Sequence, residues 1–191
     1  MNRCLLWMCC ALAACQPGPD EPQAPTGARQ AEASDDAPSS AEVAAMTARL
    51  KARHVADLPT AEQLAAIPRA EASLREIART GETMVVRTRA LTLLRHFHSP
   101  ATGELLAGIV ADAAAPKALR AAAVTGLGGQ PLDEQPERMA LVVAALSDED
   151  PRIGLAAVEA LGGSEGGRKA LREAAQTGKL SPQVQAAIEA R

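Results

Sequence analysis

A short apolar pattern recurs through the second half of the chain, and it is the feature that most restricts the fold. Copies begin at Val86, Leu119 and Ile153, so their starts are 33 and 34 residues apart. Each copy has aliphatic residues at its first, sixth and ninth positions, and a truncated copy begins at Val184. A period in the low thirties with two helices per unit is typical of a stacked helical solenoid. The repeat therefore predicts an α-solenoid.

The segments between these copies supply the second helix of each pair. They carry aliphatic residues at helical spacing, namely Leu105, Leu106, Ile109 and Val110, then Met139, Val142, Val143 and Leu146, then Ala170, Leu171 and Ala174.

Composition and chain punctuation favour the same helical fold. The chain is 47% hydrophobic but only 1% aromatic, and its abundant alanine is the strongest helix former. Ser99, Asp150 and Ser181 each precede a proline, which predicts an N-cap followed by proline in the first turn. The pairs Gly128-Gly129 and Gly162-Gly163 follow the last leucine of their copies, where a left-handed glycine could end a helix. We expect an all-α domain of about nine or ten helices.

The beginning of the domain is expected to differ from the regular repeats. Leu74, Ile77 and Ala78 suggest a second helix just before the copy at Val86. Residues 42–56 and 61–67 are expected to form an atypical starting pair, because a terminal unit has one face without a neighbour.

Residues 148–162, with the sequence DEDPRIGLAAVEALG, resemble the first helix of a short HEAT-like repeat of the phycobilisome-lyase type. Residues 119–128 match the same pattern, and the resemblance extends over about 84–191. Gly154 stands where the family pattern has arginine, and Gly126 where it has alanine. The resemblance implies a right-handed α-solenoid of stacked helix pairs, whose second helices line a concave surface that binds other proteins.

The N-terminus has the parts of an export signal, with a positive start at Arg3 and an apolar body too short to span a bilayer. The run from Leu12 to Cys15, Leu-Ala-Ala-Cys, resembles a bacterial lipobox, which implies cleavage after residue 14 and acylation of Cys15 with fatty acids such as palmitate. An ordinary secretory signal with an incidental cysteine is the alternative. Removal of 1–14 would leave Cys15 as the only cysteine, so we expect no disulfide or thiolate metal site within the mature chain.

Residues 15–41 are expected to form a disordered tether that carries the lipidated Cys15, followed by the HEAT-like domain at 42–191. The stretch 16–40 contains five prolines and no large aliphatic residue, so it cannot build a core. A segment that folds against the domain is the alternative. In the lipoprotein family an aspartate after the cysteine favours the inner membrane, so Gln16 indicates the outer membrane, facing the periplasm, if the host is Gram-negative.

Residues that could carry chemistry are few. His96 and His98 could face one metal ion only if their helix ends between them. The acidic run 148–150 is better explained by helix capping than by catalysis or calcium binding. The glycine-rich run 162–169 lacks the spacing of a phosphate loop, although an anion near Arg168 and Lys169 is an open alternative. The sequence predicts no enzyme, no cofactor and no metal.

Net charge argues against nucleic acid as a partner. The formal net charge is −3, and loss of Arg3 with the signal would make it −4. Base stacking also needs aromatic side chains, which this chain scarcely has.

The predicted function is that of a membrane-anchored lipoprotein whose HEAT-like domain is a protein-binding scaffold or adaptor in the cell envelope. Its predicted binding residues all lie on second helices: Arg75, Arg79, Glu104, Arg138, Lys169 and Arg172. The resemblance leaves a bilin-lyase-like or chaperone-like accessory factor as the alternative, and a purely structural spacer is a third possibility.

Overall fold

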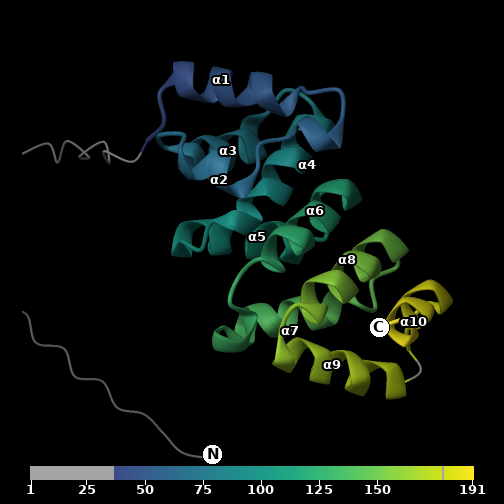
Figure 1. Cartoon of the computed structure of the whole chain (residues 1–191). Helices are drawn as coiled ribbons and strands as arrows, with labels where there is room; N and C mark the ends of the chain where they lie inside the picture. The colour runs from purple at the N-terminus through teal and green to yellow at the C-terminus, as the bar shows by residue number, and fades with distance from the viewer. Residues whose placement is uncertain (1–36, 178) are drawn as a thin grey trace, which may run out of the picture. The chain divides into compact units, whose positions relative to one another are not determined.

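The computed structural model describes residues 37–177 and 179–191, and this part of the chain is all-helical, with no strand. The predicted signal peptide, Cys15 and most of the predicted tether lie outside the described residues. Ten α-helices follow one another in these ranges, in agreement with the expected number (Figure 1). They are α1 (Ser40–Leu50), α2 (Ala61–Ala65), α3 (Ala70–Thr80), α4 (Met84–Leu93), α5 (Pro100–Ala111), α6 (Lys117–Leu127), α7 (Pro136–Ala145), α8 (Pro151–Gly162), α9 (Glu165–Gln176) and α10 (Pro182–Glu189). Three short 3₁₀ helices lie between them: η1 (Val55–Asp57), η2 (Leu94–His96) and η3 (Leu132–Glu134).

The helices from α3 onward pack in two rows. Helices α4, α6, α8 and α10 contact one another in that order, and so do α3, α5, α7 and α9. The rows are joined by contacts within the successive pairs α3 with α4, α5 with α6, α7 with α8 and α9 with α10. Figure 1 shows this succession from α1 towards α10. The three complete copies of the repeat lie on α4 and η2, on α6 and on α8, so the predicted first helices are confirmed.

The aliphatic residues that define the repeat form the centre of the core. All of them are at most 2% exposed: Val86, Leu91, Leu94, Leu119, Val124, Leu127, Ile153, Val158 and Leu161. Val184 of the truncated copy is equally buried. Burial of large apolar side chains contributes about 25 cal/mol per Å², so the recurring positions are those that hold neighbouring helices together.

The predicted N-caps are confirmed. The Ser99 side chain accepts a hydrogen bond from the Thr102 amide at the start of α5, and Asp150 and Ser181 accept equivalent bonds at α8 and α10. A proline follows each cap in the first turn.

The expected left-handed glycines are not found. Gly128 and Gly163 end α6 and α8 with φ of −62° and −75°, in the right-handed region. Glycine is needed at position 128 because a Cβ there would lie 2.7 Å from the Cα of Ala160 on α8. Gly128 therefore allows α6 and α8 to approach closely.

One arginine contact recurs with the repeat. Arg87 Nε donates to the carbonyl of Ala78 over 2.9 Å, and Arg120 Nε donates to the carbonyl of Val110 over 3.3 Å. Each arginine thus satisfies a carbonyl in the last turn of the preceding second helix. In the third copy the position is Gly154, where a Cβ would lie 2.6 Å from Val184 Cγ2, so α10 occupies the space of the missing side chain.

The first helix differs from its expected range of 42–56. It begins at Ser40 because Ser39 and Glu42 form a capping box. It ends at Leu50, where Arg89 Nη1 donates to the carbonyls of Leu50 and Ala52, each over 2.6 Å. The Arg89 side chain from α4 thus supplies hydrogen-bond donors where a further helical turn would have supplied backbone amides. Helix α2 is also shorter than its predicted range of 61–67.

Candidate functional site

The predicted lipid anchor cannot be placed on the structure, because Cys15 lies outside the described residues. None of the described helices combines the length and apolar character that crossing a bilayer requires. Lipidation and envelope localisation therefore stay predictions.

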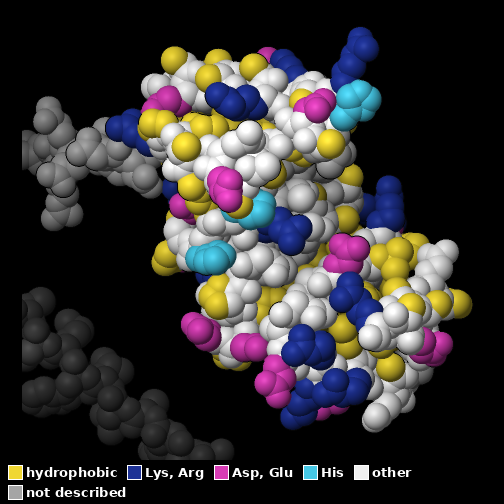
Figure 2. Space-filling model, in the orientation of Figure 1, with side chains coloured by type: hydrophobic (Ala, Val, Ile, Leu, Met, Phe, Trp, Pro, Cys, Tyr) yellow, Lys and Arg dark blue, Asp and Glu magenta, His cyan; other side chains and the backbone are white. Residues whose placement is uncertain are grey.

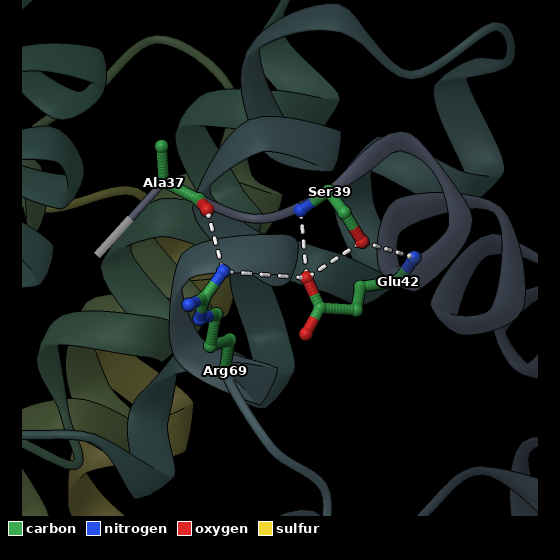
Figure 3. A network of polar contacts seen from close by, with 4 residues as sticks. All are labelled: Ala37, Ser39, Glu42 and Arg69. Atoms are coloured by element: carbon green, nitrogen blue, oxygen red, sulfur yellow. Dashed lines mark hydrogen bonds and ion pairs between the residues drawn. The ribbon is translucent and has the colours of Figure 1, made fainter. Parts of the chain in front are cut away.

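The entry of the chain into the domain is fixed by a small polar network (Figure 3). Glu42 Oε2 accepts from the Ser39 amide over 2.6 Å and from the Ser39 hydroxyl over 2.8 Å. Arg69 has a left-handed backbone with φ of 51°, and its Nη1 donates to the Ala37 carbonyl over 3.0 Å. The same nitrogen lies 3.8 Å from Glu42 Oε2. The Ser39 bonds, and then the Arg69 charge, lower the pKa of Glu42. The network is a helix start tied to α3, with no feature of a reactive site.

A groove of about 730 Å³ lies next to this network, between α1 and the end of α3. Val43, Thr47 and Ile77 are among its lining residues. Lys51 and Glu82 also line the groove and form an exposed ion pair over 3.3 Å. The groove is mainly apolar and holds no concentration of one charge.

The structure places the six predicted binding residues on one row of helices but not in one cluster. Arg75 and Arg79 lie on α3, Glu104 on α5, Arg138 on α7, and Lys169 and Arg172 on α9. The side chains of Arg79, Glu104, Lys169 and Arg172 are exposed, whereas Arg75 and Arg138 are half-buried.

Two of the six already take part in interactions, and those of Arg138 lie inside the domain. Arg138 Nη1 donates to Gln135 Oε1 over 2.6 Å, and its guanidinium covers Gly103, where a Cβ would lie 2.0 Å from that nitrogen. Arg138 therefore packs α7 onto α5. Arg75 is also engaged in an interaction. The spacing of the sequence could not reveal these orientations.

A second concave site, which we name the arginine pocket, lies between α9, the end of α8 and the end of the chain. It has a volume of about 330 Å³ and is lined by Gly162, Arg168, Leu171, Arg172, Ile188 and Arg191. No carboxylate side chain is among the lining residues. Figure 2 shows Lys and Arg side chains gathered over the region of α9.

Only part of this pocket could be anticipated from the sequence. Arg172 was predicted as a binding residue, and Arg168 was noted near a helix start. Their spacing of four residues around Leu171 is the signal that places both on one face of α9. Arg191 joins them only because the chain after α10 returns to Gly162, where a Cβ would lie 2.0 Å from Arg191 Nη1. No local pattern indicates that return.

The acidic residues near helix starts have structural partners. Asp150 caps α8, and hydrogen bonds from Arg152 lower its pKa from 3.8 to about 2. Asp148 Oδ2 lies 2.7 Å from Arg120 Nη2. The contact of Asp150 agrees with the capping interpretation of the acidic run, whereas Asp148 pairs with Arg120 of α6.

Side-chain hydroxyls at two other helix starts are held by carboxylates from the preceding unit. Glu71 on α3 accepts from Ser99 and, over 2.5 Å, from Thr102 Oγ1. Asp133 accepts from the Ser164 hydroxyl over 2.8 Å at the start of α9. Both carboxylates thus link one helix pair to the next.

His96 and His98 are exposed, and η2 ends at His96. Partial burial, followed by the charges of Arg95 and His98, lowers the pKa of His96. Within 37–177 and 179–191, no three His, Cys, Asp or Glu side chains are grouped as a metal site would require.

Of the two concave sites described above, one is mainly apolar and the other is lined by arginines, so they offer different chemistry to a ligand. The exposed charges on the row of second helices could likewise contact another macromolecule. Comparisons with protein-family models, with curated proteins and with solved structures found no match.

Proposed function

We propose that this chain is a membrane-anchored lipoprotein whose helical domain, a right-handed α-solenoid of HEAT-like helix pairs, serves as a protein-binding scaffold or adaptor in the cell envelope. The observation that carries the proposal is the arginine contact that recurs with the repeat. Arg87 and Arg120 stand 33 residues apart and each donates to the last turn of the second helix before it. A contact repeated at the period of the sequence supports a stack of equivalent units over an irregular bundle.

The two rows of helices support the same arrangement. Within each row a helix contacts its predecessor and its successor, as expected when each unit packs on its neighbours. Stacks of this kind present extended surfaces that are larger in area than a single pocket, and such surfaces bind other proteins. In this proposal the row α3, α5, α7 and α9 forms the binding surface.

The character of that row favours a protein partner. Arg79 on α3, Glu104 on α5 and Arg172 on α9 are exposed, so this row of helices carries charges of both signs. Mixed charge is complementary to the mixed polar surface of another protein, whereas a nucleic-acid backbone requires a continuous basic surface.

The proposed anchor rests on the first residues of the chain. Leu-Ala-Ala-Cys at 12–15 would place acyl chains on Cys15, and the proline-rich residues after it would separate the domain from the bilayer. In a Gram-negative host, Gln16 favours the outer membrane facing the periplasm.

Capture of partners from native membranes tests the proposal. The tagged full chain would be crosslinked in cells and purified, with the bound proteins identified by mass spectrometry. The test variant is Arg79→Glu/Glu104→Lys, because both side chains are exposed and the net charge is unchanged. The control is Arg53→Glu/Glu149→Lys, which reverses two exposed charges outside the second helices and also preserves net charge.

We expect at least one envelope protein to be captured by the wild type and the control but not by the test variant, with equal helicity in all three by circular dichroism. Equal capture by the test variant would contradict the assignment of the surface. Absence of any enriched protein from the wild type would contradict the adaptor function and favour a structural spacer.

A further inference from the structure

The arginine pocket concentrates positive charge at one end of the row of second helices. Arg168 and Arg172 lie one helical turn apart on α9, and Arg191 approaches from beyond α10. Arg168 Nη1 donates to the carbonyl of Gly162 over 3.3 Å, which holds its guanidinium at the pocket wall. Three arginines line a space of about 330 Å³ among whose lining residues there is no Asp or Glu.

Such an arrangement attracts an anion with planar oxygen acceptors. Guanidinium groups remain charged at all ordinary pH values and bind carboxylate or phosphate through paired hydrogen bonds. Like charges brought together also repel one another, so an anion placed among them gains from relieving that repulsion.

The floor of the arginine pocket is apolar, so a ligand that fills the pocket needs an apolar group as well as an anion. Leu171 is 4% exposed and belongs to the core, and Ile188 is half-buried beside it. An aliphatic side chain could cover this floor while an adjacent anion meets the arginines. The volume is at the low end of the range for small binding pockets, about 300 Å³ and upward, and suits a few residues of a peptide.

We propose that the arginine pocket binds a carboxylate of a protein partner, within an acidic segment that also carries a neighbouring aliphatic residue. This inference rests on the proposed function as a protein-binding domain and names the chemistry of one partner. Arg168, Arg172 and Arg191 bind the carboxylate, while Leu171 and Ile188 contact the aliphatic side chain.

A peptide fits these observations better than an anionic membrane surface. The apolar residues form a recessed floor, whereas a membrane-binding face presents protruding apolar side chains that can enter the lipid.

An array of immobilised short peptides of systematically varied composition tests the proposal, with the full chain without its signal as the probe. We expect bound peptides to be enriched in Asp or Glu next to Leu, Ile or Val. In solution, fluorescence anisotropy with the best acidic peptide should show about tenfold weaker binding for Arg172→Gln, as expected for the loss of one charged contact. The same peptide with Asn and Gln in place of its acids should bind at least as weakly.

The matched control is Arg53→Gln, which makes the same chemical change at an exposed site between α1 and η1. It should bind the acidic peptide as the wild type does. Vesicles of phosphatidylglycerol and inorganic phosphate are run in parallel. Binding to these vesicles or to phosphate, without selection of acidic peptides, would overturn the proposal in favour of a lipid or free-anion site.

An array with no acidic preference, or with no bound peptide, would overturn the proposal, as would equal affinity of Arg172→Gln and the wild type. Failure here leaves the capture experiment with Arg79→Glu/Glu104→Lys informative, because that pair of residues lies outside the pocket. The pocket inference can therefore fail while the adaptor function stands.

Discussion

Replacement of Arg120 by methionine should cost more stability than any other single loss of an arginine contact along the repeat. Arg120 donates Nε to the Val110 carbonyl on α5 and places Nη2 2.7 Å from Asp148 Oδ2, in the segment that leads into α8. Methionine keeps the aliphatic stem and has nearly the same helix propensity. The substitution therefore removes the polar contacts and little else.

The magnitude follows from the burial of the pair. The Arg120 and Asp148 side chains are 17% and 13% exposed, so their attraction is screened much less than that of a surface pair. Loss of the hydrogen bond to Val110 costs about 1 kcal/mol, and leaving Asp148 without its cation adds about 2 kcal/mol. We expect a total of about 3 kcal/mol, or a fall in Tm of about 6–12 °C for a domain of this size.

Arg87→Met is the matched comparison, because Arg87 occupies the same repeat position and donates to Ala78. Its expected cost is about 1 kcal/mol. Urea unfolding followed by circular dichroism would measure both values. A double-mutant cycle with Asp148→Asn should give a coupling of about 1–2 kcal/mol between positions 120 and 148.

Equal destabilisation by Arg120→Met and Arg87→Met would refute the contribution of the ion pair. A coupling energy near zero in the cycle would lead to the same conclusion. In either case the contact between Arg120 and Asp148 would not stabilise the packing of α6 with α8.

Three further predictions concern other parts of the chain. In urea unfolding, Gly126→Ala should destabilise the domain by about 1–2 kcal/mol, because its Cβ would lie 2.7 Å from the Leu91 carbonyl oxygen. Gly108→Ala should stabilise the domain by about 0.5–1 kcal/mol, because a Cβ there would have nothing within 4 Å. Asp150→Asn should lower the urea midpoint at pH 7. The difference in midpoint from the wild type should shrink as the pH falls from 3.8 to about 2, because the folded-state pKa of Asp150 is depressed and its stabilising charge is lost in that interval. A difference that stays constant with pH would contradict this cause. Cys15→Ser should move the protein from the membrane pellet to the soluble fraction, and an unchanged pellet fraction would contradict lipid anchoring.

Periodicity predicted the part of the fold that depends on local apolar patterns. The first helices of the repeats and the burial of positions such as Val86 and Leu127 could be predicted because each such residue must face the core at its helical spacing. The N-caps at Ser99 and Asp150 were predictable for the same reason, since a cap acts on amides two or three residues away.

Features that depend on distant contacts could not be predicted in this way. Helix α1 ends at Leu50, where Arg89, far along the chain, donates to the carbonyls of Leu50 and Ala52. Gly128 accommodates Ala160 of the next first helix, so its role was packing and not a left-handed turn. Local sequence gives no information on which neighbour will approach.

In the candidate site, too, the features set by local sequence could be predicted and those set by distant contacts could not. The sequence placed Arg79 and Arg172 on second helices, and both side chains are exposed as a binding residue must be. It could not show that Arg138 lies over Gly103, because that orientation depends on the packing of α7 against α5. Arg191 was missed because only the return of the chain after α10 brings it to α9.

Site-specific photo-crosslinking in cells tests the central claim most directly. A photoreactive residue would be introduced at positions 79, 104 and 172 on the exposed second helices, and separately at Arg152 and Leu155, which are exposed on α8 of the other row. We predict that the same envelope protein is crosslinked from the second-helix positions and not from α8. Crosslinks of equal strength from both rows, or from neither, would contradict a binding surface formed by the second helices.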